Sequence, residues 1–144
     1  MPSTEACAAA SSRPAAKLAS NAQTLLDAAA QASVEGKAVG LVAYDHPYPE
    51  PLHGSRPIAA AFATALILAP RDTHALAVLE IGIAHDGSGT ATRAADTRLE
   101  ALRGGVPAAR ALPLLAALAR RAAETIDLEY IGGTRLKVKV TPCR

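Results

Sequence analysis

The chain is poor in aromatic residues. Among its 144 residues there is no tryptophan, and the only aromatic side chains are Tyr44, Tyr48, Phe62 and Tyr130. Surfaces that stack nucleic-acid bases or sugar rings need several such side chains. We therefore expect no stacking surface, and the core must be built from leucine, isoleucine, valine and many alanines.

Cysteines and long apolar segments are also scarce. Cys7 and Cys143 lie near opposite ends of the chain and match neither a disulfide framework nor a zinc spacing, so we predict two free thiols. The first twelve residues lack the basic start and the apolar stretch of a signal peptide. The longest apolar run, 58–70, is shorter than the ~20 residues of a membrane span. These absences predict a soluble, cytoplasmic protein without membrane contact.

Charge of one sign is not concentrated anywhere. The net charge is +2, from −1 in residues 1–72 and +3 in residues 73–144. Five basic residues near the C-terminus would form a patch if the last helix and strand were neighbours: Arg120, Arg121, Arg135, Lys137 and Lys139. An ordinary solvated face explains them better, so we do not expect nucleic acid as a partner.

Half of the residues are apolar, which supports a packed core within one domain. We predict a disordered tail over residues 1–13 and a single α+β domain over residues 14–144. The expected architecture is an antiparallel sheet of three or four strands with helices packed on one face, in the order α-β-β-β-α-α-β.

Three segments have helical spacing of apolar residues. The first, Pro14–Val34, should end at Gly36. The second covers Ala91–Arg103. The third covers Pro107–Glu124 and either begins just before Pro113 or bends there, because proline disrupts a helix interior.

Three segments are predicted as strands. Lys37–Tyr44 and Ala75–Ala84 are apolar on both faces, so we expect them to be central and adjacent, or nearly so, in one sheet. Ile58–Ala69 fits a strand or a helix. We favour a strand because residues 70–73 form a good turn and another strand follows at once.

In the C-terminal segment, the order of apolar and charged residues limits how the residues before and after Gly132–Gly133 can pair. A two-residue turn at Gly132–Gly133 would set apolar side chains opposite charged ones. Either the loop has an odd length with a bulge, or Ile126–Ile131 continues the preceding helix to about Tyr130. Thr134–Thr141 is a strand in both cases, and its outward lysines suit a half-exposed edge. The side chains that we expect in the core are Leu41, Leu79, Ile81, Leu99, Leu115 and Leu118.

A proline-rich loop is the first candidate site. Within nine residues it carries Asp45, His46, Tyr48, Glu50 and His53. Carboxylate and imidazole groups bind metals or move protons, and the prolines would hold them stiffly. The spacing of the two histidines matches no known metal signature, so we predict no metal centre.

The pair His85–Asp86 is the second candidate site. It follows a strand and precedes a glycine-rich loop that lacks the lysine of a phosphate-binding P-loop. If both loops leave the same end of neighbouring strands, His46 or His53 would approach this pair and form a ligand site. No nucleophile elbow occurs anywhere in the chain.

These observations favour a non-enzymatic binding or interaction module. Its partner is either another protein or a second copy of the chain, which would associate through a sheet edge or an apolar helix face. The alternative is a small metal-assisted or acid–base enzyme that uses the Asp45–His53 and His85–Asp86 loops. A weaker alternative is a nucleic-acid accessory protein. The sequence indicates no particular cofactor.

Overall fold

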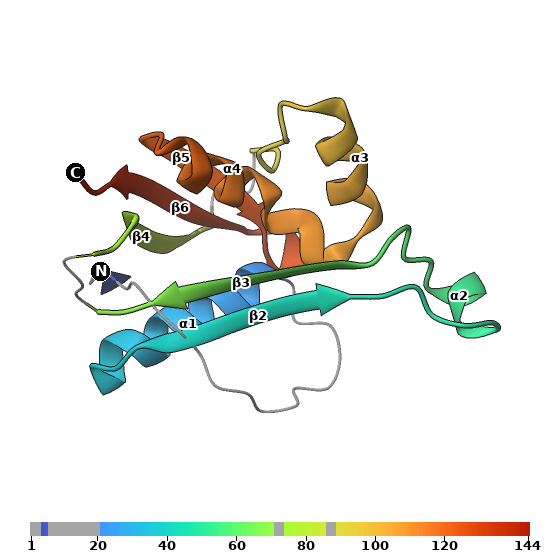
Figure 1. The fold of residues 1–144 in the computed structure, drawn as a ribbon, viewed down its shortest axis with the longest axis horizontal. Helices are drawn as coiled ribbons and strands as arrows, with labels where there is room; N and C mark the ends of the chain where they lie inside the picture. The colour runs from blue at the N-terminus through green and yellow to red at the C-terminus, as the bar shows by residue number, and fades with distance from the viewer. Residues whose placement is uncertain (1–3, 6–20, 71–73, 86–88) are drawn as a thin grey trace.

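Helices and antiparallel strands make up the structure, which confirms the predicted α+β class (Figure 1). A computed structural model describes residues 4–5, 21–70, 74–85 and 89–144. Its elements in chain order are β1 (Thr4–Glu5), α1 (Asn21–Glu35), β2 (Val39–Asp45), α2 (Leu52–Ser55), β3 (Phe62–Leu68), β4 (Ala77–Ala84), α3 (Thr97–Gly105), the 3-10 helix η1 (Pro107–Ala111), α4 (Leu112–Arg120), β5 (Glu124–Glu129), the 3-10 turn η2 (Ile131–Gly133) and β6 (Arg135–Pro142). Apart from β1, the predicted tail lies outside the described residues, and so does Cys7.

Four strands form one antiparallel sheet in the order β1-β4-β6-β5. The inward side chains of β6, which are Leu136, Val138 and Val140, are at most 1 % exposed. Lys137 and Lys139 point to the other side, as predicted, because successive side chains of a strand alternate. The prediction that this strand is a sheet edge is wrong, because β5 supplies a second neighbour.

A separate two-stranded antiparallel sheet consists of β2 and β3. The preference for a strand within Ile58–Ala69 is thus confirmed by β3. The prediction that Lys37–Tyr44 and Ala75–Ala84 are neighbours in one sheet is wrong, because β2 pairs with β3 and β4 pairs with β1 and β6. The apolar pattern on both faces of β2 therefore does not come from a central position in the larger sheet.

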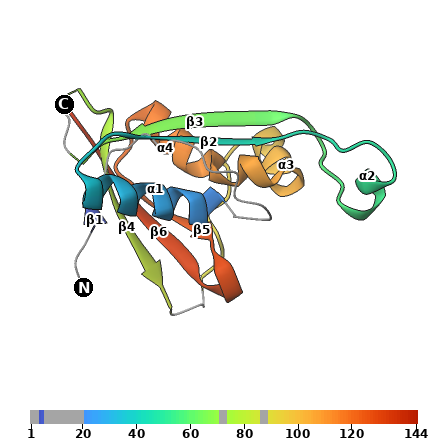
Figure 2. The ribbon, with the colours of Figure 1, turned by 90° about the horizontal axis from the view of Figure 1, so that it is seen from below.

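The helix α1 lies between the hairpin and the four-stranded sheet, as Figure 2 shows from below, and α4 contacts β5 and β6 of that sheet. One continuous core joins the three layers. Its members on α1 are Ala22, Leu25, Ala28, Ala29 and Ala32. Four of these five are alanines, and alanine lets a helix approach its neighbours closely on both sides. The inward side chains of β2 and β3 complete this core from the hairpin side.

The helix boundaries follow local capping signals. α1 ends where predicted, since Gly36 has a φ of +65°. The segment Pro107–Glu124 divides into η1 and α4, and Pro113 occupies the first turn of α4, where its missing N–H costs nothing. α3 begins at Thr97, later than expected, because the Asp96 side chain accepts hydrogen bonds from the backbone N–H groups of its first turn.

The connection between β5 and β6 has an odd number of residues, which is the first of the two alternatives given by the sequence. Glu129 pairs with Arg135, which leaves a loop of five residues, 130–134. Leu128 then faces Leu136, apolar opposite apolar. Gly132 and Gly133 have φ values of +63° and +79°, a conformation that glycine adopts without strain.

The core predictions are confirmed on the strands and fail on α3. Leu41, Leu79 and Ile81 are buried. Leu99 is 40 % exposed, because α3 lies at the periphery and buries none of its side chains fully. Two further predicted core residues, Leu115 and Leu118, are only partly buried. No helix in the described part of the chain is long and apolar enough to span a membrane.

Candidate functional site

The two histidine-bearing loops lie in different parts of the molecule. The loop that carries α2 forms the tip of the β2–β3 hairpin, and His85 follows the end of β4. Figures 1 and 2 both show α2 far from β4. The condition for a site shared by the two loops is therefore not met for His85, because the strands that precede the loops belong to different sheets. Asp86 lies outside the described residues.

Asp45 has a structural partner. Its Oδ2 atom accepts a hydrogen bond from the backbone N–H of Ala108 in η1. The Nδ2 group of Asn21 donates to the carbonyl oxygens of Pro107 and Ala108 from the other side. The carboxylate thus joins the end of β2 to η1 and does not point into a cleft.

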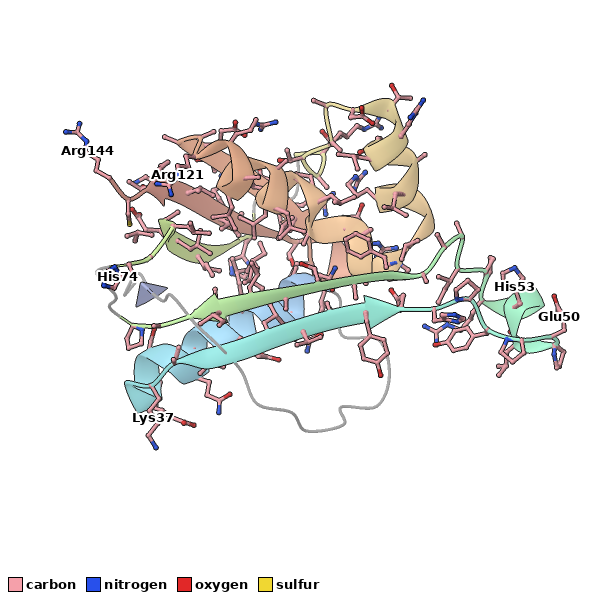
Figure 3. All side chains as sticks on the ribbon, viewed as in Figure 1. Lys37, Glu50, His53, His74, Arg121 and Arg144 are labelled. Carbon is pink, nitrogen blue, oxygen red and sulfur yellow. The ribbon has the colours of Figure 1, made fainter. Side chains whose placement is uncertain are left out.

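The remaining residues of the proline-rich loop are spread over its surface. His46 and Glu50 are exposed, Tyr48 is 39 % exposed, and the Nδ1 atom of His46 lies 2.9 Å from the carbonyl oxygen of Pro47. His53 is half-buried, and its enclosed Nδ1 atom has no hydrogen-bond partner among the described residues. Figure 3 shows His53 and Glu50 together at the hairpin tip.

Within the described residues, the two loops do not form one joint site. The described residues contain no group of three or more histidine, cysteine or acidic side chains that could hold a metal ion. General acid–base catalysis needs a titratable side chain within hydrogen-bond reach of the proton that it moves in a bound substrate. The structure does not bring the His85 loop to the hairpin tip, so ligand binding at either loop stays a prediction.

The outward face of the hairpin is a feature that sequence reasoning misinterpreted. Cross-strand pairing places three rows on it: Gly40 opposite Ile67, Val42 opposite Ala65, and Tyr44 opposite Ala63. We call these six residues the outer hairpin face. Its three large side chains are strongly exposed, at 63 % for Val42, 75 % for Tyr44 and 74 % for Ile67.

The outer hairpin face carries no charged side chain. Figure 2 shows α1 on the opposite side of the hairpin. The signal for this face was present in the sequence as the second apolar face of Lys37–Tyr44. We interpreted that pattern as burial on both sides, whereas one side packs on the core and the other faces outward.

The outward face of the four-stranded sheet has the opposite character. Its cross-strand rows alternate in charge: Glu80 opposite Lys139, and Asp127 opposite Lys137. The Nζ atom of Lys139 lies 2.8 Å from Glu80 Oε1. Each of these two lysines thus faces a carboxylate across the sheet.

A partly exposed ion pair stabilises α3 against the preceding turn. Arg103 donates two hydrogen bonds to the carboxylate of Glu100, and the backbone N–H of Ala94 donates a third. These bonds lower the pKa of Glu100 from 4.5 to about 2, with the bond from Arg103 as the largest cause. Arg103 also lies 3.6 Å from Glu129. Every group of this cluster has a partner, so the cluster is structural.

Comparison with models of known protein families, with curated proteins and with solved structures found no match to this chain.

Proposed function

We propose that the protein is a non-enzymatic interaction module that binds a protein partner through the outer hairpin face. The observation that carries this proposal is the exposure of Val42, Tyr44 and Ile67 side by side on a face without charge. Contiguous exposed apolar patches on soluble monomers are uncommon, and larger ones mark interaction sites.

The chemistry of the face favours an apolar protein surface as its partner. Nucleic acid is recognised through phosphate contacts with lysine and arginine, and the face has neither. A small polar ligand needs convergent hydrogen-bonding side chains, and only the hydroxyl of Tyr44 is available here. A protein surface of matching shape can bury the whole patch. We also propose the cytoplasm as the place where this binding occurs.

The edges of the hairpin lack the usual protection against association. β2 and β3 pair only with each other in the described structure. Their sole charged residue is Asp45, at the end of β2. Natural sheet edges are commonly guarded by lysine, proline or bulges, so an unguarded apolar hairpin indicates a surface that is covered when it functions.

Site-specific photo-crosslinking in cells that make the protein tests this proposal. Position 44 would carry p-benzoylphenylalanine in place of tyrosine, within the full chain. We expect a covalent adduct with a protein, and we expect Ile67→Lys to abolish it. Because Ile67 is 74 % exposed, the lysine should leave the fold intact.

A matched control uses Leu76, which is 58 % exposed and lies just before β4. Leu76→Lys should leave the adduct at position 44 unchanged. The proposal is overturned if position 44 gives no adduct, or if the adduct persists in the Ile67→Lys variant.

A further inference from the structure

The rows of the outer hairpin face each combine one large and one small side chain. Ile67 stands opposite Gly40, Val42 opposite Ala65, and Tyr44 opposite Ala63. The large residues are not all on one strand: two lie on β2 and one lies on β3. Each row therefore has a raised side and a hollow side, and the raised side changes strand along the hairpin.

From this pattern, and resting on the proposed function, we propose that the partner is a second copy of this chain, packed face to face. A two-fold axis parallel to the strands and midway between them lays β2 of one copy over β3 of the other. Each row then faces the same row of the second copy, and the large residue of one copy lies over the small residue of the other. Tyr44 lies over Ala63 of the second copy, Val42 over Ala65, and Ile67 over Gly40.

The rival two-fold axis, across the strands, fits less well. It lays β2 over β2 and β3 over β3, so that the central row sets Val42 against Val42 and Ala65 against Ala65. Two large side chains then collide beside a gap between two small ones. Sheets pack at a nearly constant separation of about 10 Å, which requires facing side chains of evenly matched total size.

Charge also permits this pairing. No row brings a charged group into the interface, so no carboxylate or ammonium loses its water without a partner. The net charge of +2 per chain produces little repulsion between copies. A different protein that binds through complementary charge would have no charged side chain on this face to pair with.

The area predicts a dimer of modest affinity. Three large and three small exposed side chains amount to roughly 500 Å² per copy, if a fully exposed large side chain contributes about 150–250 Å². Burying this face on both copies gives about 1,000 Å², at the low end of specific interfaces. The dimer should therefore dissociate on dilution, with a Kd in roughly the micromolar range.

The central row provides the sharpest test. Packed sheets cross at about 30°, so the row nearest the centre keeps its register best. Sedimentation equilibrium of the full chain would be measured from about 1 μM to about 1 mM for four proteins: the parent, Val42→Ala, Ala65→Val and the double variant. The double variant exchanges the large and small residues within one row.

We expect each single change to weaken the dimer and the double change to restore it. Val42→Ala leaves a gap twice in the two-fold interface, which should raise the Kd at least about tenfold. Ala65→Val sets valine against valine and should raise it similarly, although valine is the better strand former and should not destabilise the monomer. The double variant should return to within about threefold of the parent.

Further variants separate the failure of this inference from the failure of the proposed function. Ile67→Lys should give a monomer throughout the range, and Leu76→Lys should dimerise like the parent. Circular dichroism verifies that each variant is folded. A double variant no tighter than the single ones overturns the proposed alignment of rows.

A parent chain that stays monomeric at the highest concentration overturns self-association altogether. If position 44 then still forms an adduct with another protein, the interaction module stands and only the second copy is wrong. If position 44 forms no adduct, both proposals fail. A face covered by the residues before α1 within the same chain would also give a monomer, and it would count against the second copy.

Discussion

At the scale of single residues, glycine permits a close backbone approach at the end of α3. The carbonyl oxygen of Gly105 accepts a hydrogen bond of 3.1 Å from the N–H of Ala59. A Cβ atom at position 105 would lie 2.8 Å from the Cβ of Ala59, closer than such atoms ever come. The loop that leads into β3 therefore packs on α3 only because residue 105 has no side chain.

We accordingly predict that Gly105→Ala destabilises the protein by roughly 1–3 kcal/mol, the usual cost of forcing an extra methyl group into a packed site. Gly104→Ala is the matched control, since a Cβ there meets no atom within 4 Å. It should be neutral or stabilising by up to about 1 kcal/mol through the helix propensity of alanine. Urea unfolding measures both. Equal effects of the two substitutions would show that the close approach to Ala59 is not limiting.

The carboxylate of Glu100 makes stability depend on pH. Its pKa is lowered from 4.5 to about 2 in the folded protein, chiefly by the hydrogen bond from Arg103. A group with a depressed folded pKa stabilises the protein at pH values above its unfolded pKa. This contribution is lost as the pH falls through the window from about 4.5 to about 2.

We predict that Glu100→Gln flattens the fall in stability across this window. The glutamine can still accept from the backbone N–H of Ala94, but it has no proton to take up on unfolding. Thermal unfolding at several pH values between 6 and 2 gives the two slopes to compare, with ~1 proton of difference at most. Parallel slopes for parent and variant would show that Glu100 does not contribute.

At the scale of elements, the short helix η1 joins parts of the chain that are distant in sequence. Ala108 donates its backbone N–H to Asp45 at the end of β2. Its carbonyl oxygen and that of Pro107 accept from Asn21 at the start of α1. Asp45 thus satisfies an N–H group in the first turn of η1, which has no carbonyl partner within the helix. Asn21 adds a side-chain donor to the carbonyl groups of the same turn.

We predict that Asp45→Ala costs about 0.5–2 kcal/mol, the range measured for the loss of a helix-capping side chain. Asp45→Asn is the control, because its amide oxygen can still accept from Ala108 and most of the stability should remain. Chemical unfolding of both variants gives the comparison. If the two substitutions cost the same, the negative charge and not the hydrogen bond is what matters.

The C-terminal hairpin of β5 and β6 shows what can be predicted from the alternation of apolar and charged side chains alone. Two apolar faces must coincide across a ladder, and this excludes a two-residue turn at Gly132–Gly133 whatever the rest of the fold does. The odd loop of five residues satisfies that condition. The alternation could not distinguish this loop from a continued helix. That choice depends on whether a second strand pairs with β6, which is a long-range contact.

At the scale of the whole molecule, the alanine-rich composition explains the layered arrangement. A helix whose buried side chains are mostly alanine has little bulk on either side, so it packs between two sheets without pushing them apart. α1 contributes four alanines to the core shared with both sheets. In this arrangement one face of the β2–β3 hairpin covers α1, and the other face of the hairpin stays exposed.

Local sequence patterns were enough to predict the α+β class, the position of most strands, the glycine that ends α1 and the inward side chains of β6. These depend on local alternation, capping and backbone conformation, which a short stretch of residues contains. The proposed docking surface was present in the same pattern, since Lys37–Tyr44 is visibly apolar on both faces. Such a pattern indicates that a face is apolar, but it does not indicate which part of the protein or which partner covers that face.

Local patterns did not reveal which strands share a sheet, where the two histidine-bearing loops lie or which apolar face is exposed. Strand pairing is a long-range choice that depends on the total burial achieved by the whole chain, and several partners suit β2 equally well locally. The chain gains more by covering both sides of α1 than by adding β2 to the larger sheet. That choice separates the two loops and leaves Val42, Tyr44 and Ile67 facing outward.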